Sequence, residues 1–281
     1  MPRRFHWVRP LHTLDFSPLQ LHPTMVLSLT IEALATCIRG QLCDWRVLVE
    51  QHRWSTVIVG FDVRWLRPFT FFDASRLELD CGMRTRKDDQ LLEVQLELRP
   101  ESEDERVVSA SLLCRPVEVT GGAALDARPA PMRGAPLAML RDDEREPSAP
   151  GRVVPQREAL VSSGSLVAER ITDFEISRDE CEVADQWRFS VLPALAGRAR
   201  EALAMEGGDP RVRHGLSRAL ASTTAELRRP MYLREAGQVR TRVYEHEGSL
   251  AYVHHIHGAP LGPGPDAERP LCATVIEQLR A

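Results

Sequence analysis

Glu32 is the residue whose surroundings most clearly suggest chemistry. It is the only charged side chain between residues 24 and 38, in the apolar stretch TMVLSLTIEALATCI. An ionised carboxylate is costly to bury, so a glutamate in such a segment must be paired or have a raised pKa. A carboxyl group tuned in this way can act as a general acid or base. The alternative is that the segment turns Glu32 towards solvent, where most carboxylates lie.

Other ionisable residues are weaker candidates. Asp15 and His22 lie in LDFSPLQLH, just before this segment, and can line a site, although a loop aspartate and a surface histidine are the commoner interpretation. His52 and His214 occupy matching positions in an internal repeat, which favours a structural role at the start of a strand. Both remain candidates for contacts with a substrate.

Three histidines at positions 254, 255 and 257 suggest a metal site at first sight. On a strand, His255 and His257 would share a face while His254 points away. No cysteine or carboxylate is spaced to complete a coordination set, so we predict no metal. The sequence also has no Gly-rich phosphate loop and no G-x-S-x-G nucleophile motif.

An internal repeat indicates which elements must position these residues. The stretches HRWSTVIVGFDVRWLRPFTFFDA (52–74) and HGLSRALASTTAELRRPMYLREA (214–236) share His, Ser, Arg-Pro and an acidic residue before Ala. The offset is constant, because 214 − 52, 217 − 55, 230 − 68 and 235 − 73 all equal 162. The chain is therefore predicted to contain two copies of one structural unit.

Each copy is predicted to hold one helix and several long antiparallel strands. One helix is expected over 24–40, ending at Arg39-Gly40, and the other over 189–204, where Pro193 suits a first turn. Strict alternation in LLEVQLEL predicts a half-buried strand over 92–98. Further strands are predicted over 106–113, 239–243 and 269–276, with a Glu-Gly turn at 247–248.

The composition is that of a globular protein. The chain has 281 residues, 43% hydrophobic and 27% charged, which is enough for two domains. We expect units over 1–120 and 166–281, joined by a Pro/Ala/Arg-rich linker over 121–165 that is long enough to be an ordered wrap.

The net charge and the cysteine content indicate which partners and which cellular compartment to expect. A net charge of −4 argues against nucleic acid as a partner. The six cysteines are scattered, and there is no signal-peptide pattern and no apolar run of membrane-spanning length. We therefore expect a cytoplasmic protein without a membrane partner, whose cysteines are small core residues.

One buried helix wrapped by a long antiparallel sheet, written twice, resembles the hot-dog fold in its tandem double form. The segments that carry the resemblance are about 12–119 and 166–280, and the phrase Arg-Pro-x-x-x-x-acidic looks like the second strand and turn of this superfamily. The predicted class is α+β, a tandem double hot-dog, with an unrelated duplication as the alternative. Hot-dog proteins mostly act on acyl thioesters and pair two units, so a fused chain would carry its own partner.

The first helix is similar to that of hot-dog β-hydroxyacyl dehydratases. In those enzymes a Met-Pro-Gly turn opens the helix, and a glutamate seven residues after the methionine is catalytic. Met25 and Glu32 have this spacing, but Val26 and Leu27 replace the Pro and Gly. The position of the dehydratases' catalytic histidine is Pro18.

In the second half, Leu192-Pro193-Ala194 takes the place of Met-Pro-Gly, and the glutamate position becomes Ala199. The histidine position becomes Asp185, and hot-dog thioesterases usually carry a catalytic aspartate in this loop. ADQW resembles their Asp-rich loop, with Arg188 in place of a glycine. Trp187 and Arg188 are therefore candidate substrate-binding residues.

Hot-dog sites form across the interface between units, so the resemblance implies a composite site of Asp185 and Glu32. The second site, of Pro18 and Ala199, would be inactive, and Asp15 and His22 would line it. Two close carboxylates in a dry pocket would have separated pKa values, so that one activates water or attacks the thioester while the other donates a hydrogen bond. The missing histidine favours hydrolysis over dehydration.

The leading prediction is an acyl thioesterase acting on acyl-CoA or an acyl carrier protein, with no cofactor beyond the pantetheine-linked acyl substrate. The alternatives are a dehydratase or isomerase, an acyltransferase or decarboxylase of polyketide pathways, and a non-catalytic thioester-binding partner. A monomer of fused units and a homodimer are both open. Cations that can meet phosphates or an acidic carrier, unless they are only solvated strand ends, are Arg84, Arg86, Lys87, Arg211 and Arg213.

Overall fold

The chain divides into two compact units, residues 1–150 and 151–281. The computed structural model describes residues 4–86, 90–120, 127–131, 133, 153–182, 185–206, 209–262, 264 and 267–280. Within these residues no helix combines the length and the apolar character needed to cross a membrane.

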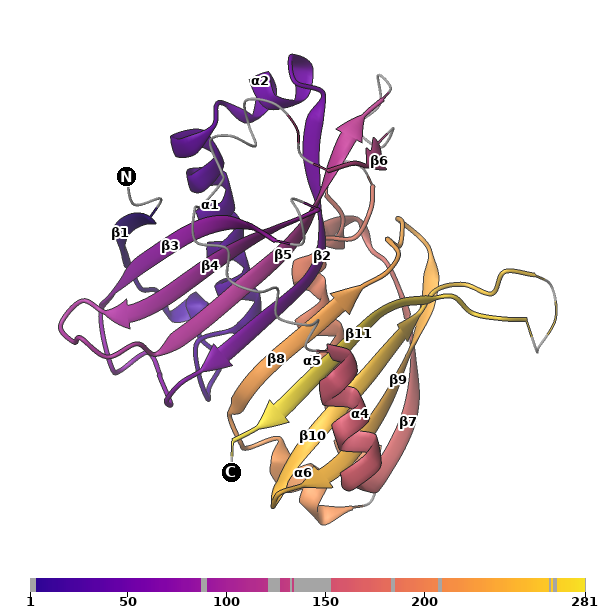
Figure 1. Ribbon diagram of the computed structural model, residues 1–281. Coiled ribbons are helices and arrows are strands. Elements are labelled where there is room, and N and C mark those ends of the chain that lie inside the picture. The colour runs from indigo at the N-terminus through magenta and orange to yellow at the C-terminus, as the bar shows by residue number, and fades with distance from the viewer. Residues whose placement is uncertain are drawn as a thin grey trace. The chain divides into compact units, whose positions relative to one another are not determined.

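The first unit is a long helix, α1 (Pro23–Gln41), packed on an antiparallel sheet (Figure 1). The strand order is β1–β3–β4–β5–β2, with the short β6 paired to β5. A 3-10 turn, η1 (Thr13–Asp15), precedes α1, and a short helix, α2 (Trp45–Glu50), follows it. The strands are β1 (Arg4–Pro10), β2 (Trp54–Trp65), β3 (Arg76–Arg86), β4 (Leu91–Pro100), β5 (Val108–Val119) and β6 (Ala127–Pro129).

Helix α1 forms because its start is capped and most of its surface is apolar. His22 accepts a hydrogen bond from the Thr24 N–H (3.4 Å), and Pro23 occupies the first turn. The buried side of the helix contacts β3, β4 and β5. The strands present alternate apolar residues to it, among them Leu79, Leu92, Leu96 and Leu98, all fully buried. Each such leucine contributes about 1.5–3 kcal/mol to folding.

The second unit repeats this plan. Its sheet has the order β8–β11–β10–β9–β7, and helix α5 (Leu192–Glu206) packs against it. The 3-10 turns η2 (Arg178–Glu180) and η3 (Phe189–Val191) precede α5, and α6 (Pro210–Gly215) follows it. The strands are β7 (Ser165–Glu175), β8 (Leu220–Leu227), β9 (Ala236–His246), β10 (Ser249–His257) and β11 (Leu271–Leu279).

The predicted helices and strands are confirmed, with ends that differ by at most three residues except for β5, which ends six residues later than predicted. The Glu247-Gly248 turn has positive φ at both residues (49° and 74°), as a tight hairpin between β9 and β10 requires. All six cysteines are free, and Cys37, Cys81, Cys114 and Cys272 are buried as expected.

The range predicted as a linker contains elements of both units. Strand β6 pairs with β5 in the first unit, and helix α4 (Val153–Ser163) packs on the sheet of the second. Val153 and Leu160 of α4 join a buried cluster that includes Ile276 of β11. Because neighbouring strand residues face opposite ways, and Glu277 contacts α5, the helices α4 and α5 cover opposite faces of this sheet.

One turn in each unit explains why the two copies of the repeat keep the same residues at a constant offset. In the first unit the Asp73 carboxylate accepts a hydrogen bond from the Thr70 N–H (2.5 Å). In the second unit the Glu235 carboxylate accepts one from the Tyr232 N–H (3.1 Å). The acidic residue therefore closes the turn that follows each Arg-Pro pair, in the manner of an Asx turn.

Each of these turns also holds the loop that leads into the central helix. The Leu21 N–H donates to the carbonyl of Phe69 (3.1 Å), and the Trp187 N–H donates to the carbonyl of Met231 (2.8 Å). The repeat thus encodes the strand, its closing turn and the anchor of the candidate site loop together.

We expect Asp73→Ala to lower the free energy of unfolding by about 1 kcal/mol, because the Thr70 N–H loses the acceptor that closes the turn. Urea denaturation followed by tryptophan fluorescence measures the change. Asp73→Asn is the matched control, since its side-chain carbonyl still accepts. Equal stabilities for the alanine variant and the wild type would show that the turn closes without this bond.

The interior of the second unit contains a charged network beneath α5. The Arg200 guanidinium donates to the Glu277 carboxylate (2.7 Å), and the His254 imidazole lies 3.4 Å from the same oxygen. His254 also bonds to Thr241 (2.9 Å). Burial by itself would raise the pKa of Glu277, but the charge of Arg200 and the contact with His254 outweigh it and lower the pKa.

We expect Arg200→Met to cost about 3–5 kcal/mol at pH 7, because it leaves the Glu277 charge buried without its partner. A carboxylate with a lowered pKa stabilises the fold above its unfolded pKa and ceases to do so as pH falls through the folded value. The loss should therefore shrink on acidification. Urea titrations at pH 7 and pH 4 test this. Arg198→Met, which breaks a more exposed pair with Glu180, should cost less than about 1 kcal/mol.

Candidate active site

The loop before α1 holds a buried carboxylate, Asp15, which is only 5% exposed. One of its oxygens accepts from the His12 N–H (2.8 Å), and the other accepts from Arg9 (3.1 Å). Both oxygens are therefore engaged in closing η1. Asp15 acts here as a structural residue, and a role in binding substrate would require it to release one of these contacts.

His22 is the N-cap of α1. Its Nδ1 accepts from the Thr24 N–H and lies 2.7 Å from the Thr24 hydroxyl. Burial lowers the pKa of His22, so the ring is neutral at neutral pH. Nδ1 is therefore the acceptor at the start of α1. Because an acceptor nitrogen carries no proton, we assign the ring proton to Nε2.

Glu32 is exposed, together with Ser28 and Arg39 on the same stripe of α1. The helical period places residues four and seven apart on one side, and this is the side that faces away from the sheet. The expectation that Glu32 is buried is therefore wrong. Its catalytic role stays a prediction.

Asp185 lies in the loop before α5 with a left-handed backbone (φ 55°). Aspartate and asparagine tolerate this conformation better than other non-glycine residues. Its carbonyl accepts from the Leu233 N–H (2.8 Å), so the repeated turn holds it in place. Its carboxylate is exposed and accepts from Arg178 (2.6 Å).

The two neighbours of Asp185 differ in their surroundings. Trp187 is 4% exposed and belongs to the core. Arg188 is exposed and donates to the carbonyl of Asp179 (2.6 Å). Of the two predicted substrate-binding residues, only Arg188 therefore presents its side chain to solvent.

Glu180 is the carboxylate that the sequence reasoning missed. It closes η2 as Asp15 closes η1: it accepts from the Ser177 N–H (3.0 Å) and from Arg198 (2.7 Å). Burial would raise its pKa, but these hydrogen bonds outweigh burial and lower the pKa. The signal in the sequence was an acidic residue shortly before each central helix, Asp15 in the first half and Glu180 in the second. The constant offset of 162 residues does not align these two positions.

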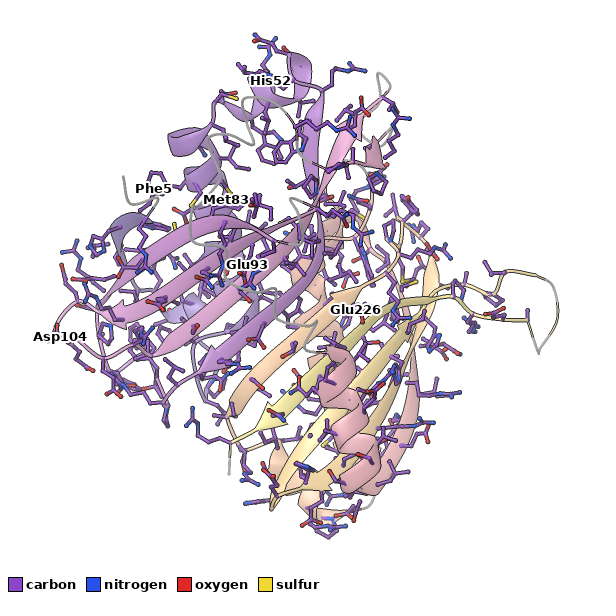
Figure 2. The ribbon with its side chains drawn as sticks, in the orientation of Figure 1. Phe5, His52, Met83, Glu93, Asp104 and Glu226 are labelled. Atoms are coloured by element: carbon purple, nitrogen blue, oxygen red, sulfur yellow. The ribbon has the colours of Figure 1, made fainter. Side chains whose placement is uncertain are left out.

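His52 and His214 are both exposed; His52 follows the short helix α2, and His214 lies in the last turn of the short helix α6. Each short helix is capped by an aspartate, Asp44 or Asp209. His52 lies beside α2 in Figure 2. The 19 residues of α1 span about 28 Å, so His52 is a helix length away from the loop with Asp15. The structure does not bring these histidines to their own unit's loop.

Most of the candidate phosphate-binding cations already have acidic partners. Arg84 and Arg86 both bond to Glu93, which Figure 2 labels on β4. Arg211 bonds to Asp209 (2.9 Å) and Glu245 (2.5 Å). Arg213 is exposed, and Lys87 lies outside the described residues.

The histidines at 254, 255 and 257 do not converge on one point. His254 is fully buried and points to Thr241, whereas burial lowers the pKa of His255 to about 4. Over the part of the chain that the structure describes, no three His, Cys, Asp or Glu side chains are grouped to hold a metal ion.

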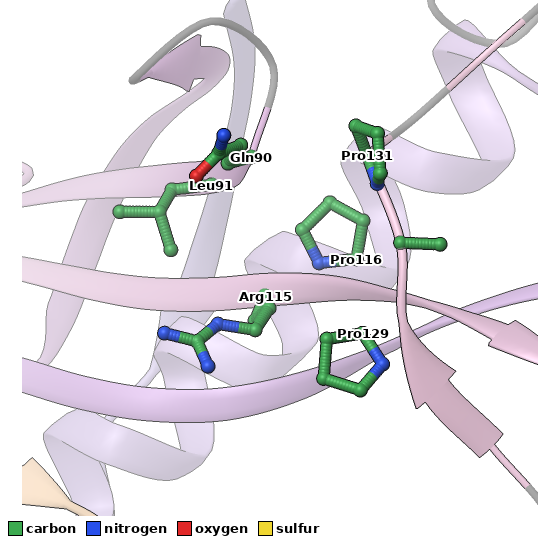
Figure 3. Close-up of a pocket in the computed structure, with 7 residues that line it drawn as sticks. Gln90, Leu91, Arg115, Pro116, Pro129 and Pro131 are labelled. Atoms are coloured by element: carbon green, nitrogen blue, oxygen red, sulfur yellow. The ribbon is translucent and has the colours of Figure 1, made fainter.

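A pocket of about 390 Å³ lies elsewhere in the first unit (Figure 3). It forms where β4 begins and β6 ends along the same side of β5, which leaves a gap beside Arg115. Its described lining contains no carboxylate and no histidine, so it offers no acid or base for hydrolysis. The lining residues are Gln90, Leu91, Arg115, Pro116, Pro129, Ala130 and Pro131.

Neither a family model nor a curated protein sequence matches the chain. Solved structures do. A protein assigned as an oleoyl thioesterase from Lactobacillus plantarum has a TM-score of 0.70 at 9% identity, over 99% of this chain and 95% of its own. The 12:0-ACP thioesterase from Umbellularia californica has a TM-score of 0.69 at 11% identity, over 100% and 98%. The fold is a tandem double hot-dog.

An acyl-ACP thioesterase from Bacteroides thetaiotaomicron agrees, with a TM-score of 0.65 at 5% identity over 99% of this chain and 98% of its own. The predicted fold class is thus confirmed over the whole double hot-dog chain. Identities this low establish the fold, and the chemistry must be argued from the residues.

We expect Glu32→Gln and Asp185→Asn each to change the free energy of unfolding by less than about 0.5 kcal/mol, because both side chains are exposed. Asparagine also accepts the left-handed backbone at 185. Asp185→Val is the contrasting variant, and a β-branched residue there should cost about 1–3 kcal/mol. A large loss in either conservative variant, measured by urea denaturation, would contradict the exposed placement.

Proposed function

We propose that this double hot-dog chain is an acyl thioesterase, which hydrolyses an acyl group carried by coenzyme A or an acyl carrier protein. One observation carries the proposal. The three thioesterases above each match at least 99% of this chain and at least 95% of their own length. The likeness therefore includes both units in order, rather than one shared module.

Asp185 is the proposed base. Its main chain is held in the left-handed turn, and its exposed carboxylate accepts a hydrogen bond from Arg178. It takes a proton from a water whose oxygen attacks the thioester carbonyl carbon. The tetrahedral intermediate then collapses, the C–S bond breaks, and the thiolate receives a proton.

Glu32 is the proposed second carboxyl group of the site. It lies on the exposed stripe of α1, away from the sheet. In its acid form the carboxyl group donates a hydrogen bond to the thioester carbonyl oxygen and stabilises the charge that develops there.

The environment of His22 argues against dehydration. A dehydratase needs a base for the α-proton, and the dehydratases' histidine position is Pro18. The lone pair of the nearby His22 caps α1, and both oxygens of Asp15 are engaged. Neither His22 nor Asp15 is therefore free to act as the base of a dehydratase, and this supports hydrolysis.

Thiol release from a panel of acyl-CoA and acyl-carrier substrates tests the proposal. We expect Asp185→Asn to lower kcat by about 10²–10⁴-fold, the usual contribution of a general base, and Glu32→Gln to lower it by a smaller factor. Matched controls are Asp104→Asn at the tip of the β4–β5 hairpin (Figure 2) and Glu158→Gln on α4, both exposed carboxylates.

The outcomes separate the rival functions. Full activity in Asp185→Asn would remove that residue from the mechanism. Loss of water without thiol release would identify a dehydratase. Transfer of the acyl group to a second acceptor would identify an acyltransferase. Carrier binding without any turnover would identify a non-catalytic partner.

A further inference from the structure

Gln20, in the loop before α1, is 3% exposed, and neither its Oε1 nor its Nε2 has a hydrogen-bond partner. A side-chain amide offers one acceptor and two donors, and buried groups of this kind are almost always satisfied. The amide therefore calls for a partner that carries both a donor and an acceptor.

The backbone around this amide is fixed. Phe16 and Leu21 form an isolated bridge that closes a small hairpin. Within it, the Ser17 N–H donates to the carbonyl of Gln20 (2.8 Å), and the Gln20 N–H donates to the Ser17 hydroxyl (3.2 Å). The main-chain groups of Gln20 are thus satisfied, and its side-chain amide is the group left over.

The second unit contains a matched glutamine. The hairpin of Cys181 and Trp187 is closed by the same kind of bridge, and Gln186 precedes Trp187 as Gln20 precedes Leu21. There the amide nitrogen has a partner, because Gln186 Nε2 donates to Glu182. The amide nitrogen at this position is therefore hydrogen-bonded in the second unit and not in the first.

A chain of aromatic rings begins on the same hairpin and reaches the surface. The ring of Phe16 lies 5.8 Å from those of Phe69 and Phe71, and Phe71 lies 5.7 Å from Phe72. Phe69 is fully buried, whereas Phe71 and Phe72 are 37% and 93% exposed. Phe71 and Phe72 therefore form the solvent-accessible end of this chain of rings.

The second unit lacks this apolar chain. At the offset of 162 residues, Phe69 and Phe72 correspond to Met231 and Arg234. Arg234 is paired with Glu175 (3.0 Å). An unpaired amide and an exposed aromatic chain therefore occur together only in the first of the two described turns.

We propose that the hairpin 16–21 and the aromatic turn bind the pantetheine arm of the substrate, with Gln20 hydrogen-bonded to one of its secondary amides. The inference rests on the proposed function, and it names Gln20 as a binding residue rather than a catalytic one. Each amide of the arm carries one N–H donor and one carbonyl acceptor, which match the two free ends of Gln20. The methylene groups between the amides suit the faces of Phe16 and Phe71.

The direct test is calorimetric binding of S-methylpantetheine to the full chain. We expect Gln20→Leu to weaken the affinity about 5–50-fold, because an amide of the ligand then loses its partner. Gln186→Leu should leave the affinity unchanged. Gln20→Leu should not lower the melting temperature, since it removes two unpaired polar atoms, whereas a structural glutamine would lower it. Gln20→Met is the second variant if the leucine variant fails to fold.

A kinetic test uses two octanoyl thioesters, one of pantetheine and one of ethanethiol, which has no amide. We expect Gln20→Leu to raise KM for the pantetheine thioester and to leave kcat/KM for the ethanethiol thioester unchanged. Equal affinity of wild type and Gln20→Leu for S-methylpantetheine, or no binding by wild type, would overturn the inference. Binding without thiol release would instead overturn the thioesterase proposal alone, so the two failures are distinguishable.

Discussion

One main-chain hydrogen bond in each unit ties the candidate chemistry to the fold. It runs from the loop before the central helix to the turn after the Arg-Pro pair, from Leu21 to Phe69 and from Trp187 to Met231. The carboxylate of Asp73 or Glu235 shapes that turn, and the bond then fixes the loop. A loop anchored in this way presents its side chains in a defined order even though it has no regular structure of its own.

The two units have the same arrangement of helix and sheet but different side chains in their interiors. In the first unit the helix rests on apolar strand residues throughout. In the second, Arg200 reaches from α5 to Glu277 and His254 beneath it. A buried ion pair of this kind contributes little to net stability compared with an apolar replacement, but removing one partner is costly. The second unit is therefore sensitive to pH and to single substitutions in its interior, and the first to changes in side-chain volume.

The carboxylates of the loops divide into structural and available groups. Asp15 and Glu180 close their 3-10 turns and are held by an arginine each. Asp185 is held through its main chain, and its exposed carboxylate pairs with Arg178. A general base must be accessible to its substrate, and of these three residues Asp185 is the exposed one.

The sequence alone determined the duplication, the central helices, most strands and the double hot-dog class. Those features depend on helix caps, turn residues and the alternation of apolar and polar residues. These signals all come from residues that lie close together in the sequence. It did not determine the outward side of α1, because that helix is apolar nearly all round and only its packing on β3, β4 and β5 leaves Glu32 exposed. The unpaired amide of Gln20 and the partners of Glu277 were equally hidden. Arg200 and Glu277 are 77 positions apart, and only the folded chain decides which polar groups meet and which stay unpaired.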